Sequence, residues 1–284
     1  MSRVSRGDAS VAPTGTASLR LGGGRGLRLE SFPETAVTQA LEAHADALQR
    51  GGQNVLKRDH RSRVTATLSD GRAVVVKEVV KGGTRRHIAD AFRGSPARRA
   101  FLGGHGLLAR GIGACTPLAF LEARRCGLPV ASTAILEDLR PALPSTEYAA
   151  RGPAEARAVL DALCRLAIAL HRSRIIHGDL RAQQIYVHEP SDRDPGSLDV
   201  ALIDLEGVRF ARRLSRRQRI QSLAELNASL ADELAPAEAR RRAFDAYFQA
   251  LPFERGSRDA LEEIVRRSRE RRHLWSGADC RAGS

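Results

Sequence analysis

Two aspartates at the ends of apolar runs are the residues in this sequence best suited to catalysis. Asp179 follows the run Ile175-Ile176-His177-Gly178, and Asp204 follows the apolar residues 200–203, 25 positions further along the chain. Phosphoryl transfer uses such a pair, because one carboxylate orients an acceptor hydroxyl while the other holds Mg²⁺ on the nucleotide phosphates. We therefore expect Asp179 to be the catalytic carboxylate and Asp204 to be a metal ligand.

The segments His177-Gly178-Asp179 and Ile203-Asp204-Leu205-Glu206 resemble the kinase-like superfamily, and they are closer to small-molecule kinases than to protein kinases. That resemblance places a metal-binding residue five positions after the catalytic aspartate, where this chain has Gln184. Its amide oxygen is a suitable donor, so we expect Gln184 to bind Mg²⁺ or to contact a phosphate. Glu206 is either a further carboxylate of the metal site or the partner of an arginine such as Arg209. We expect His177 to hold the loop through backbone hydrogen bonds.

A lysine on a predicted β-hairpin completes the set. Two β-branched runs, residues 64–68 and 73–80, flank Asp70-Gly71, a pair that tolerates the positive φ angles of a tight turn. On the second strand Lys77 shares a face with two valines. In a kinase-like fold this lysine grips the α- and β-phosphates of ATP. The alternative is an edge lysine that protects the sheet from aggregation.

Two features of kinases are missing from the sequence. The stretch 56–64 before the lysine strand contains no glycine, so backbone amides cannot approach phosphates as closely. Its basic side chains either take over part of that contact or form a solvated loop. The helix predicted from Ser95-Pro96 to Arg110 carries no acid to pair with Lys77. His105 is either a polar substitute for that acid or a structural residue.

Strand patterns come first in the chain and helical patterns come later. Helices are predicted at about 33–49, 154–172, 237–251 and 258–272, and a capping box at Ser215 and Gln218 begins another. This order predicts an α+β fold with two lobes, a small antiparallel-sheet N-lobe and a mostly helical C-lobe, as in protein kinases. The expected divisions are a mobile tail at 1–30, an N-lobe with a leading helix at 31–138, a C-lobe at 139–276 and a C-terminal tail at 277–284.

Composition excludes several classes of protein. No apolar run approaches the roughly 20 residues that span a bilayer, and no secretory signal follows Met1, so we expect a cytoplasmic protein. The four cysteines are widely spaced, which fits neither a zinc site nor a disulfide framework. The net charge of +13 attracts polyanions such as nucleic acid, anionic lipid or a phosphorylated substrate. Only 4% of residues are aromatic, which disfavours single-stranded nucleic acid.

Features near the motifs indicate which class of molecule accepts the phosphoryl group. Gly178 stands where many protein kinases have an arginine that receives an activation-loop phosphate, and only about ten residues separate Asp204 from the helix cap at Ser215. A loop that short leaves little platform for a peptide, which favours a sugar, a lipid or another small hydroxyl compound. An arginine-rich run at 209–219 either binds an anionic acceptor at a membrane surface or is a solvated helix start.

Segments outside the catalytic motifs resemble one bacterial family. Ser95-Pro96-Ala97-Arg98-Arg99-Ala100-Phe101, then Gly111-Ile112 leading to Thr116-Pro117-Leu118-Ala119, and the arginine-rich run to Leu226-Asn227, are similar to the lipopolysaccharide-core kinases that act on Kdo and heptose. The resemblance covers roughly residues 54–275. It implies an ATP- and Mg²⁺-dependent kinase of a lipid A-core sugar at the inner face of the cell membrane, with Lys77, Asp179 and Asp204 in the roles given above.

Three other functions stay open on the sequence. The missing glycines and helix acid are compatible with a nucleotide-binding pseudokinase or scaffold. The catalytic motifs are shared with other small-molecule kinases and with atypical Ser/Thr kinases. Charge alone would suit a nucleic-acid binder, which we do not expect. The sequence carries no signal for an oligomeric state.

Overall fold

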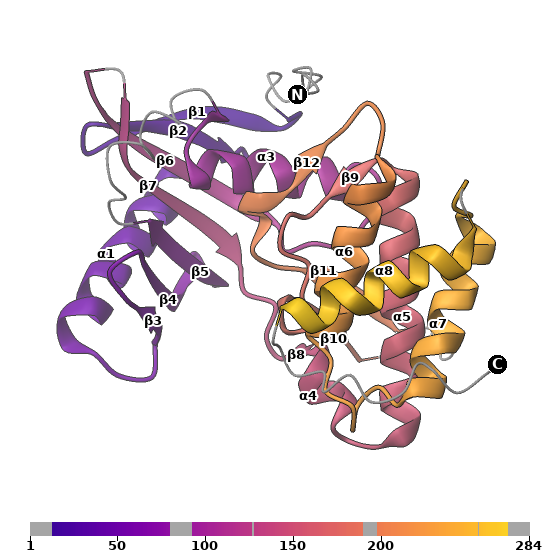
Figure 1. Ribbon diagram of the computed structural model, residues 1–284. Coiled ribbons are helices and arrows are strands. Elements are labelled where there is room, and N and C mark those ends of the chain that lie inside the picture. Colours follow the sequence, from indigo (N-terminus) through magenta and orange to yellow (C-terminus); the bar gives the residue numbers. More distant parts are fainter. Residues whose placement is uncertain (1–12, 80–92, 127, 190–197, 255, 272–284) are drawn as a thin grey trace.

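A seven-stranded antiparallel sheet forms the N-terminal lobe of the computed structural model, which describes residues 13–79, 93–126, 128–189, 198–254 and 256–271 (Figure 1). The strand order is β1-β2-β6-β7-β5-β4-β3. The elements of this lobe are β1 (Thr16–Leu21), β2 (Gly24–Leu29), α1 (Glu34–Arg50), β3 (Val55–Arg58), β4 (Ser62–Ser69), β5 (Arg72–Val79), α3 (Pro96–Leu108), β6 (Pro117–Arg125) and β7 (Leu128–Glu137).

The two faces of this sheet are covered by different helices. On β5, Val74 and Val76 are fully buried in a cluster with Val37 and Ala40 of α1. Residues of the opposite face alternate with them, so Lys77 points away from α1. Helix α3 packs on that other side through Phe101, which contacts the ring of Phe120 on β6. The sheet therefore presents Lys77 to the space between the lobes.

The first two strands correct the expectation of a mobile tail over residues 1–30 for the part that the structure describes; residues 1–12 lie outside the described residues. Residues 16–29 form a hairpin whose second strand pairs with β6, and Leu19 is fully buried. The glycines that made this segment look disordered have structural roles. Gly22 and Gly23 take positive φ angles in the turn, and a Cβ on Gly26 would lie only 1.7 Å from the carbonyl oxygen of Phe120.

Helices dominate the second lobe, which follows the segment that leaves β7. Two small sheets order the strands around the motif residues: β11-β10-β8 and β12-β9. The elements are β8 (Leu143–Pro144), α4 (Ser145–Ala149), α5 (Pro153–Arg172), β9 (Ile175–Ile176), the 3-10 turn η1 (Ala182–Gln184), β10 (Ile185–His188), β11 (Asp199–Leu202), the 3-10 turn η2 (Leu205–Gly207), β12 (Arg209–Phe210), α6 (Arg216–Ala228), α7 (Ala237–Ala250) and α8 (Ser257–Glu270).

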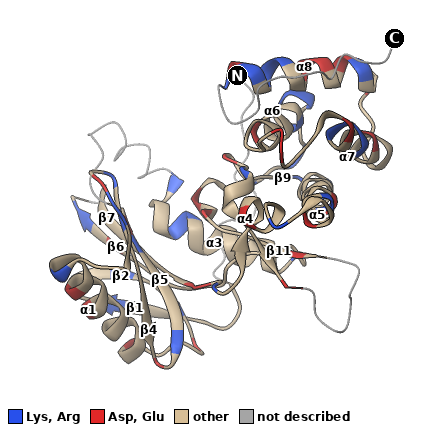
Figure 2. Cartoon of the chain, turned by 90° about the horizontal axis from the view of Figure 1, so that it is seen from below, with Lys and Arg blue, Asp and Glu red and all other residues tan. Residues whose placement is uncertain are grey.

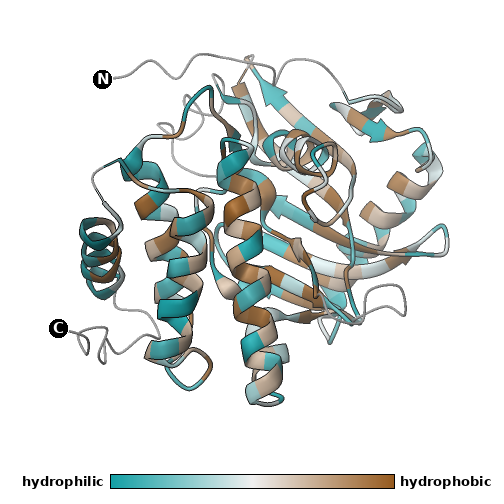
Figure 3. Ribbon diagram, turned by 90° about the vertical axis from the view of Figure 1, so that its right-hand side faces the viewer, coloured by the Kyte–Doolittle hydropathy of each residue, from teal (hydrophilic) through white to brown (hydrophobic). Residues whose placement is uncertain are grey.

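Each of the helices α5, α7 and α8 carries an apolar and a polar face, and Figure 3 shows both colours along the C-lobe helices. The apolar faces meet in one core that also contains Leu180 and Ile185 of the motif region. The predicted α+β, two-lobed, protein-kinase-like architecture is therefore confirmed. The predicted tail at 277–284 lies outside the described residues.

Candidate active site

Lys77 is held by two carboxylates that both come from the segment after β11. Its ammonium nitrogen bonds Oδ1 of Asp204 and lies 3.4 Å from Oε2 of Glu206. Burial by itself would lower the pKa of Lys77, but the charges of Glu206 and Asp204 outweigh it and raise that pKa above the ordinary 10.5. Lys77 is therefore a fixed cation at the contact between the lobes, and its strand lies inside the sheet, between β7 and β4, rather than at an edge.

Glu206 supplies the acid that the sequence did not place on α3. No described contact joins Glu206 to Arg209, the arginine we considered as its partner. His105 is not the substitute either, because its Nε2 lies 2.9 Å from the carbonyl of Pro117 and its ring packs edge-on against Phe101. The acid that pairs with the lysine thus comes from η2 in this protein, where other kinases take it from the helix that corresponds to α3.

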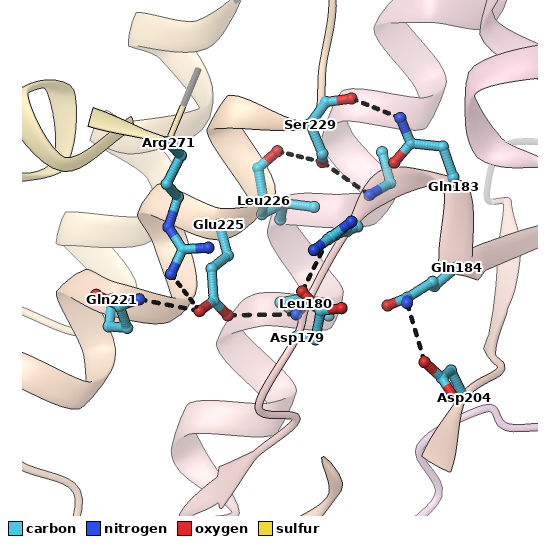
Figure 4. A network of polar contacts seen from close by, with 12 residues as sticks. Asp179, Leu180, Gln183, Gln184, Asp204, Gln221, Glu225, Leu226, Ser229 and Arg271 are labelled. Carbon is cyan, nitrogen blue, oxygen red and sulfur yellow. Dashed lines mark hydrogen bonds and ion pairs between the residues drawn. The ribbon is translucent and has the colours of Figure 1, made fainter. Parts of the chain in front are cut away.

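Asp204 and Gln184, the two predicted metal ligands, lie side by side. The Ile203 amide donates to the Gln184 carbonyl over 2.9 Å, and the Gln184 side-chain amide donates to Oδ2 of Asp204 over 3.2 Å (Figure 4). Asp204 takes a left-handed backbone conformation with φ 58° and ψ 51°, which aspartate tolerates better than most residues. This turn aims its carboxylate at both Lys77 and Gln184.

These two side chains fit a Mg²⁺ ion. Both offer hard oxygen donors, and Oε1 of Gln184 is buried without a hydrogen-bond partner. Such an orphaned acceptor is costly unless a cation or a donor reaches it. No cluster of three or more His, Cys, Asp or Glu with metal-ligand geometry occurs among the described residues, so any ion here would take its remaining ligands from nucleotide phosphates and water.

The loop that carries Asp179 is shaped by a close backbone contact. Gly178 has φ +89°, and a Cβ there would lie 2.8 Å from the carbonyl oxygen of Gly207. Gly207 is equally constrained, since its Cβ would lie 2.3 Å from the carbonyl of His177. His177 is buried, and its Nε2 lies 3.2 Å from the Ile203 carbonyl, consistent with a structural role. Backbone packing against Gly207 therefore requires a glycine at position 178.

Asp179 is the exposed member of the motif. Its Oδ1 accepts a hydrogen bond from Nε of Arg181 over 2.8 Å, and both side chains are about two-fifths exposed, at 42% and 41%. An exposed carboxylate can meet an incoming hydroxyl, and the guanidinium beside it can meet a phosphate. Arg181 was not predicted as a site residue from the sequence, although an arginine two residues after the predicted catalytic aspartate was a usable signal.

Helix α6 and the residue that follows it anchor the loop that carries Asp179. These contacts were not predicted from the sequence. Oε2 of Glu225 accepts the Leu180 amide over 3.3 Å, and Oγ of Ser229 accepts the Ala182 amide over 2.8 Å (Figure 4). The Gln183 side chain donates to the Ser229 carbonyl over 3.1 Å. Glu225 is 7% exposed within the apolar run 223–228, and an acid in such a run was the available clue.

Glycines let α3 approach the acidic segment closely. A Cβ on Gly104 would lie 2.4 Å from Cγ of Pro117 and 2.7 Å from Cδ1 of Leu205, and one on Gly106 would meet the Phe210 ring at 2.3 Å. Nε of Arg99 also donates to the Glu206 carbonyl over 3.2 Å. The glycines that weaken the helix intrinsically are those that seat it on η2 and β12.

The glycine-free hairpin before Lys77 is closed by an aspartate. Oδ1 of Asp59 accepts the amides of Arg61 and Ser62, each over 2.7 Å, and these hydrogen bonds lower the pKa of Asp59 to about 2. Its other oxygen pairs with Lys57 at 3.2 Å. The amides at the hairpin tip are thus already occupied, in contrast to a glycine-rich phosphate loop.

The arginine-rich run divides into two groups. Arg216 pairs with Glu263, and Arg219 donates to the Tyr247 hydroxyl over 2.9 Å and stacks on Phe253 at 3.9 Å, so both are structural. The others have exposed side chains, and Figure 2 shows basic residues at one end of α6. We call this group the basic face; it consists of Arg209, Arg212, Arg213 and Arg217.

Comparisons with known proteins bear on the family and on the fold. The family model described as "Lipopolysaccharide kinase (Kdo/WaaP) family" matches residues 52–247. A solved structure described as "WaaP in complex with acyl carrier protein" is similar in fold, with a TM-score of 0.55 and 22% sequence identity, over 79% of this chain and 91% of that one. No curated protein matches the chain.

The resemblance expected from the motifs is therefore confirmed. At 22% identity the solved structure supports the fold, and the family model, which spans more than half of the chain, supports the family. The chain belongs to the lipopolysaccharide kinase (Kdo/WaaP) family and is a kinase.

Proposed function

We propose that this protein transfers the γ-phosphoryl group of ATP to a sugar hydroxyl of a lipopolysaccharide-core or lipid A-type glycolipid. The observation that carries the proposal is the convergence of Lys77, Asp204, Glu206 and Gln184. The exposed Asp179 lies on the loop whose Gly178 packs against Gly207, next to Glu206 in the chain. These groups have the roles that phosphoryl transfer demands, which are charge neutralisation, metal binding and orientation of the nucleophile.

In this proposal each side chain has one task. The carboxylate of Asp179 orients the acceptor hydroxyl and takes its proton as the new oxygen–phosphorus bond forms and the bond to the β-phosphate oxygen breaks. Lys77 holds the α- and β-phosphates, and the Arg181 guanidinium stabilises charge on the transferred group. Asp204 and Gln184 would hold Mg²⁺, which when bound neutralises the phosphate oxygens.

Substitution of Asp179 tests this assignment. Because the side chain is exposed, Asp179→Asn should leave the melting temperature unchanged while lowering kcat roughly 100- to 10,000-fold. The assay is transfer of γ-phosphate from ATP to Kdo- or heptose-bearing lipid A precursors, with free sugars and a generic protein as other acceptors. Asp161→Asn, an exposed aspartate on α5, is the matched control. Unchanged kcat in the Asp179 variant would remove it from catalysis.

We propose that the basic face binds the anionic part of the acceptor at the membrane. It follows directly after the metal segment, and β12 at its start pairs with β9, which leads into Gly178 and Asp179. Residues 211–215 pass straight into α6, so little chain is present to carry a peptide. Of the helices described, none has the length and hydropathy of a membrane span. A peripheral position at the cytoplasmic face, held by arginine–phosphate contacts, is the corresponding proposal.

Acyl carrier protein is a second proposed partner, because the solved structure most useful for comparison is a complex with it. The C-lobe has an apolar cavity between α5, α6 and α7, lined by residues such as Leu163, Leu226 and Phe244. The lining has the apolar character that an acyl chain requires, and the cavity, about 50 Å³, would have to widen to admit one. The test is co-purification and thermal stabilisation with acylated and unacylated carrier protein; equal absence of both effects would dismiss this partner.

The closed hairpin tip favours one alternative, a pseudokinase that binds nucleotide without turnover. Asp59 occupies amides that would otherwise face phosphates. Calorimetry with Mg-ATP, combined with the transfer assay, separates the two functions. Binding without transfer to any acceptor supports the alternative, and transfer to a lipopolysaccharide precursor removes it.

A further inference from the structure

A polar contact from helix α8 reaches the loop that carries Asp179, which we call the catalytic loop. Arg271, at the C-terminal end of α8, donates from Nη2 to Oε1 of Glu225 over 2.6 Å (Figure 4). The same oxygen accepts the side-chain amide of Gln221 over 3.0 Å. The other oxygen of Glu225 is the one that accepts the Leu180 amide, next to Asp179. A chain of two hydrogen bonds therefore joins α8 to the loop.

Because the carboxylate of Glu225 is buried, its ion pair with Arg271 is more than a surface contact. Glu225 has a side chain only 9% exposed, and a buried carboxylate is destabilising unless a cation and further donors satisfy it. Arg271 is the cation, with a side chain 25% exposed. By holding Oε1 together with Gln221, it fixes the torsion of the carboxylate so that Oε2 faces Leu180.

The Leu180 amide depends on this orientation. Leu180 is fully buried, so its N–H has no access to water if Glu225 turns away. An unsatisfied buried amide is costly, and the loop would have to move to relieve it. Asp179 is the adjacent residue and would move with it, which matters because a displacement of about 1 Å at a reacting group costs catalysis up to roughly 100-fold.

We propose that Arg271 is a positioning residue, which sets the catalytic loop through Glu225 and makes helix α8 part of the catalytic apparatus. The family model ends at residue 247, so Arg271 lies beyond the part of the chain that the model matches. This inference rests on the proposed function only for its kinetic readout. The position of the loop itself is measurable without turnover.

The first experiment compares Arg271→Ala with a variant that weakens the docking of α8 elsewhere. Ser268 is also buried between α8 and α6, where its hydroxyl accepts from Asn227 over 3.0 Å and does not touch Glu225. Arg271→Ala should lower kcat roughly 10- to 100-fold with the KM for ATP within about 2-fold, since Lys77 and Asp204 are anchored separately. Ser268→Ala should lower the melting temperature without that loss. Arg271→Lys, which keeps the charge, should recover part of the rate.

The second experiment is a double-mutant cycle. Glu225→Gln keeps an acceptor for the Leu180 amide but removes the buried charge. Adding Arg271→Ala to this variant should therefore lower kcat little further. Hydrogen exchange of the Leu180 amide, measured without nucleotide, should accelerate at least about tenfold in Arg271→Ala and stay near wild type in Ser268→Ala.

These arms separate the possible failures. Equal kcat loss and equal exchange in the Arg271 and Ser268 variants would overturn the proposal, because docking alone would explain both. Additive effects of Arg271→Ala and Glu225→Gln would also overturn it. If the wild-type protein phosphorylates no acceptor, the proposed function fails, and the exchange of Leu180 still decides whether Arg271 holds the loop.

Discussion

Lys77 of the N-lobe and Glu206 of the C-lobe form an ion pair at a separation of 3.4 Å. It takes the place of a pair between the lysine and a helix acid. In kinases that pair holds the lysine in position for the phosphates. Here α3 packs on η2, and its Arg99 donates to the Glu206 backbone. At the residue scale, the site therefore keeps the charge arrangement of a kinase and changes the element that supplies it.

Glu206→Gln tests this assignment. Loss of one carboxylate should lower the pKa of Lys77 and raise the KM for ATP roughly 3- to 10-fold, equivalent to about 1 kcal/mol for a partly buried pair. A lower pKa means more neutral amine, so acylation of Lys77 followed by mass spectrometry should be faster at a given pH. Glu78→Gln is the control, since Glu78 pairs with Arg63 on the neighbouring strand. A change in Mg²⁺ dependence with unaltered Lys77 reactivity would instead assign Glu206 to the metal.

At the element scale, helix α3 and the turn η2 behave as one packed unit. The helix carries glycine where Leu205 and Pro117 press against it, and the turn carries both Asp204 and Glu206. Intrinsic propensity alone would make Gly→Ala in this helix stabilising by about 1 kcal/mol. The tight contacts reverse that sign, because an added methyl must displace neighbours that are fixed by the core.

Gly104→Ala should therefore destabilise the protein, by about 1 to 3 kcal/mol, and displace the turn that bears Asp204. Gly103→Ala is the graded comparison, because its Cβ would meet neighbours at 3.0 Å, against 2.4 Å for Gly104. Denaturant unfolding gives the free energies, and the transfer assay gives the effect on turnover. If Gly104→Ala stabilised the protein, α3 and η2 would not be packed as tightly as we propose.

At the scale of the whole molecule, charge and burial are distributed unevenly. The net charge of +13 includes arginines that hold the C-lobe together and arginines that face solvent. Arg219 belongs to the first kind: it donates to the Tyr247 hydroxyl, which lies 2.7 Å from Nδ1 of the buried His171. The basic face belongs to the second kind and is available to an anionic surface.

Replacement of the four arginines of the basic face by glutamine should weaken binding to vesicles that contain anionic lipid. The expected loss is about 1 kcal/mol per arginine at low salt, and it should shrink as salt is added. The matched control removes the same charge from other exposed positions: Arg20, Arg157, Arg241 and Arg242. Equal losses of vesicle binding in the two variants would show that net charge, and not the basic face, determines binding.

Acid should destabilise the C-lobe through His171. Burial, together with the charge of Arg219, lowers the pKa of His171 to about 3. The unfolded chain, with a histidine pKa near 6.5, then binds more protons than the native state between those values, so stability falls as pH decreases below about 6.5. The loss should reach about 2 to 3 kcal/mol by about pH 4.5.

Unfolding at several pH values measures this slope. His171→Gln should flatten it, and the exposed His188→Gln should leave it as in wild type. An unchanged slope in the His171 variant would place the acid sensitivity in another group.

The sequence by itself determined the catalytic motifs and most of the elements. Local rules were sufficient for these: the Asp70-Gly71 turn, the Ser215 capping box and the 3.6-residue periodicity of α5 all act within a few residues. The same locality explains why Asp179, Asp204 and Gln184 could be predicted as site residues, since that prediction depends on their spacing along the chain. It also explains the error at residues 16–29, where glycines that serve close strand packing had the composition of a tail.

Only the tertiary structure decided which partners these residues have. Glu206 meets Lys77 across 129 positions of sequence, and Glu225 and Arg271 meet beneath a loop that neither adjoins in the chain. The glycines of α3 looked like weak points of a helix until Leu205 and Phe210 were seen against them. Such contacts follow from the packing of whole elements around a shared core, a long-range condition that no local pattern encodes.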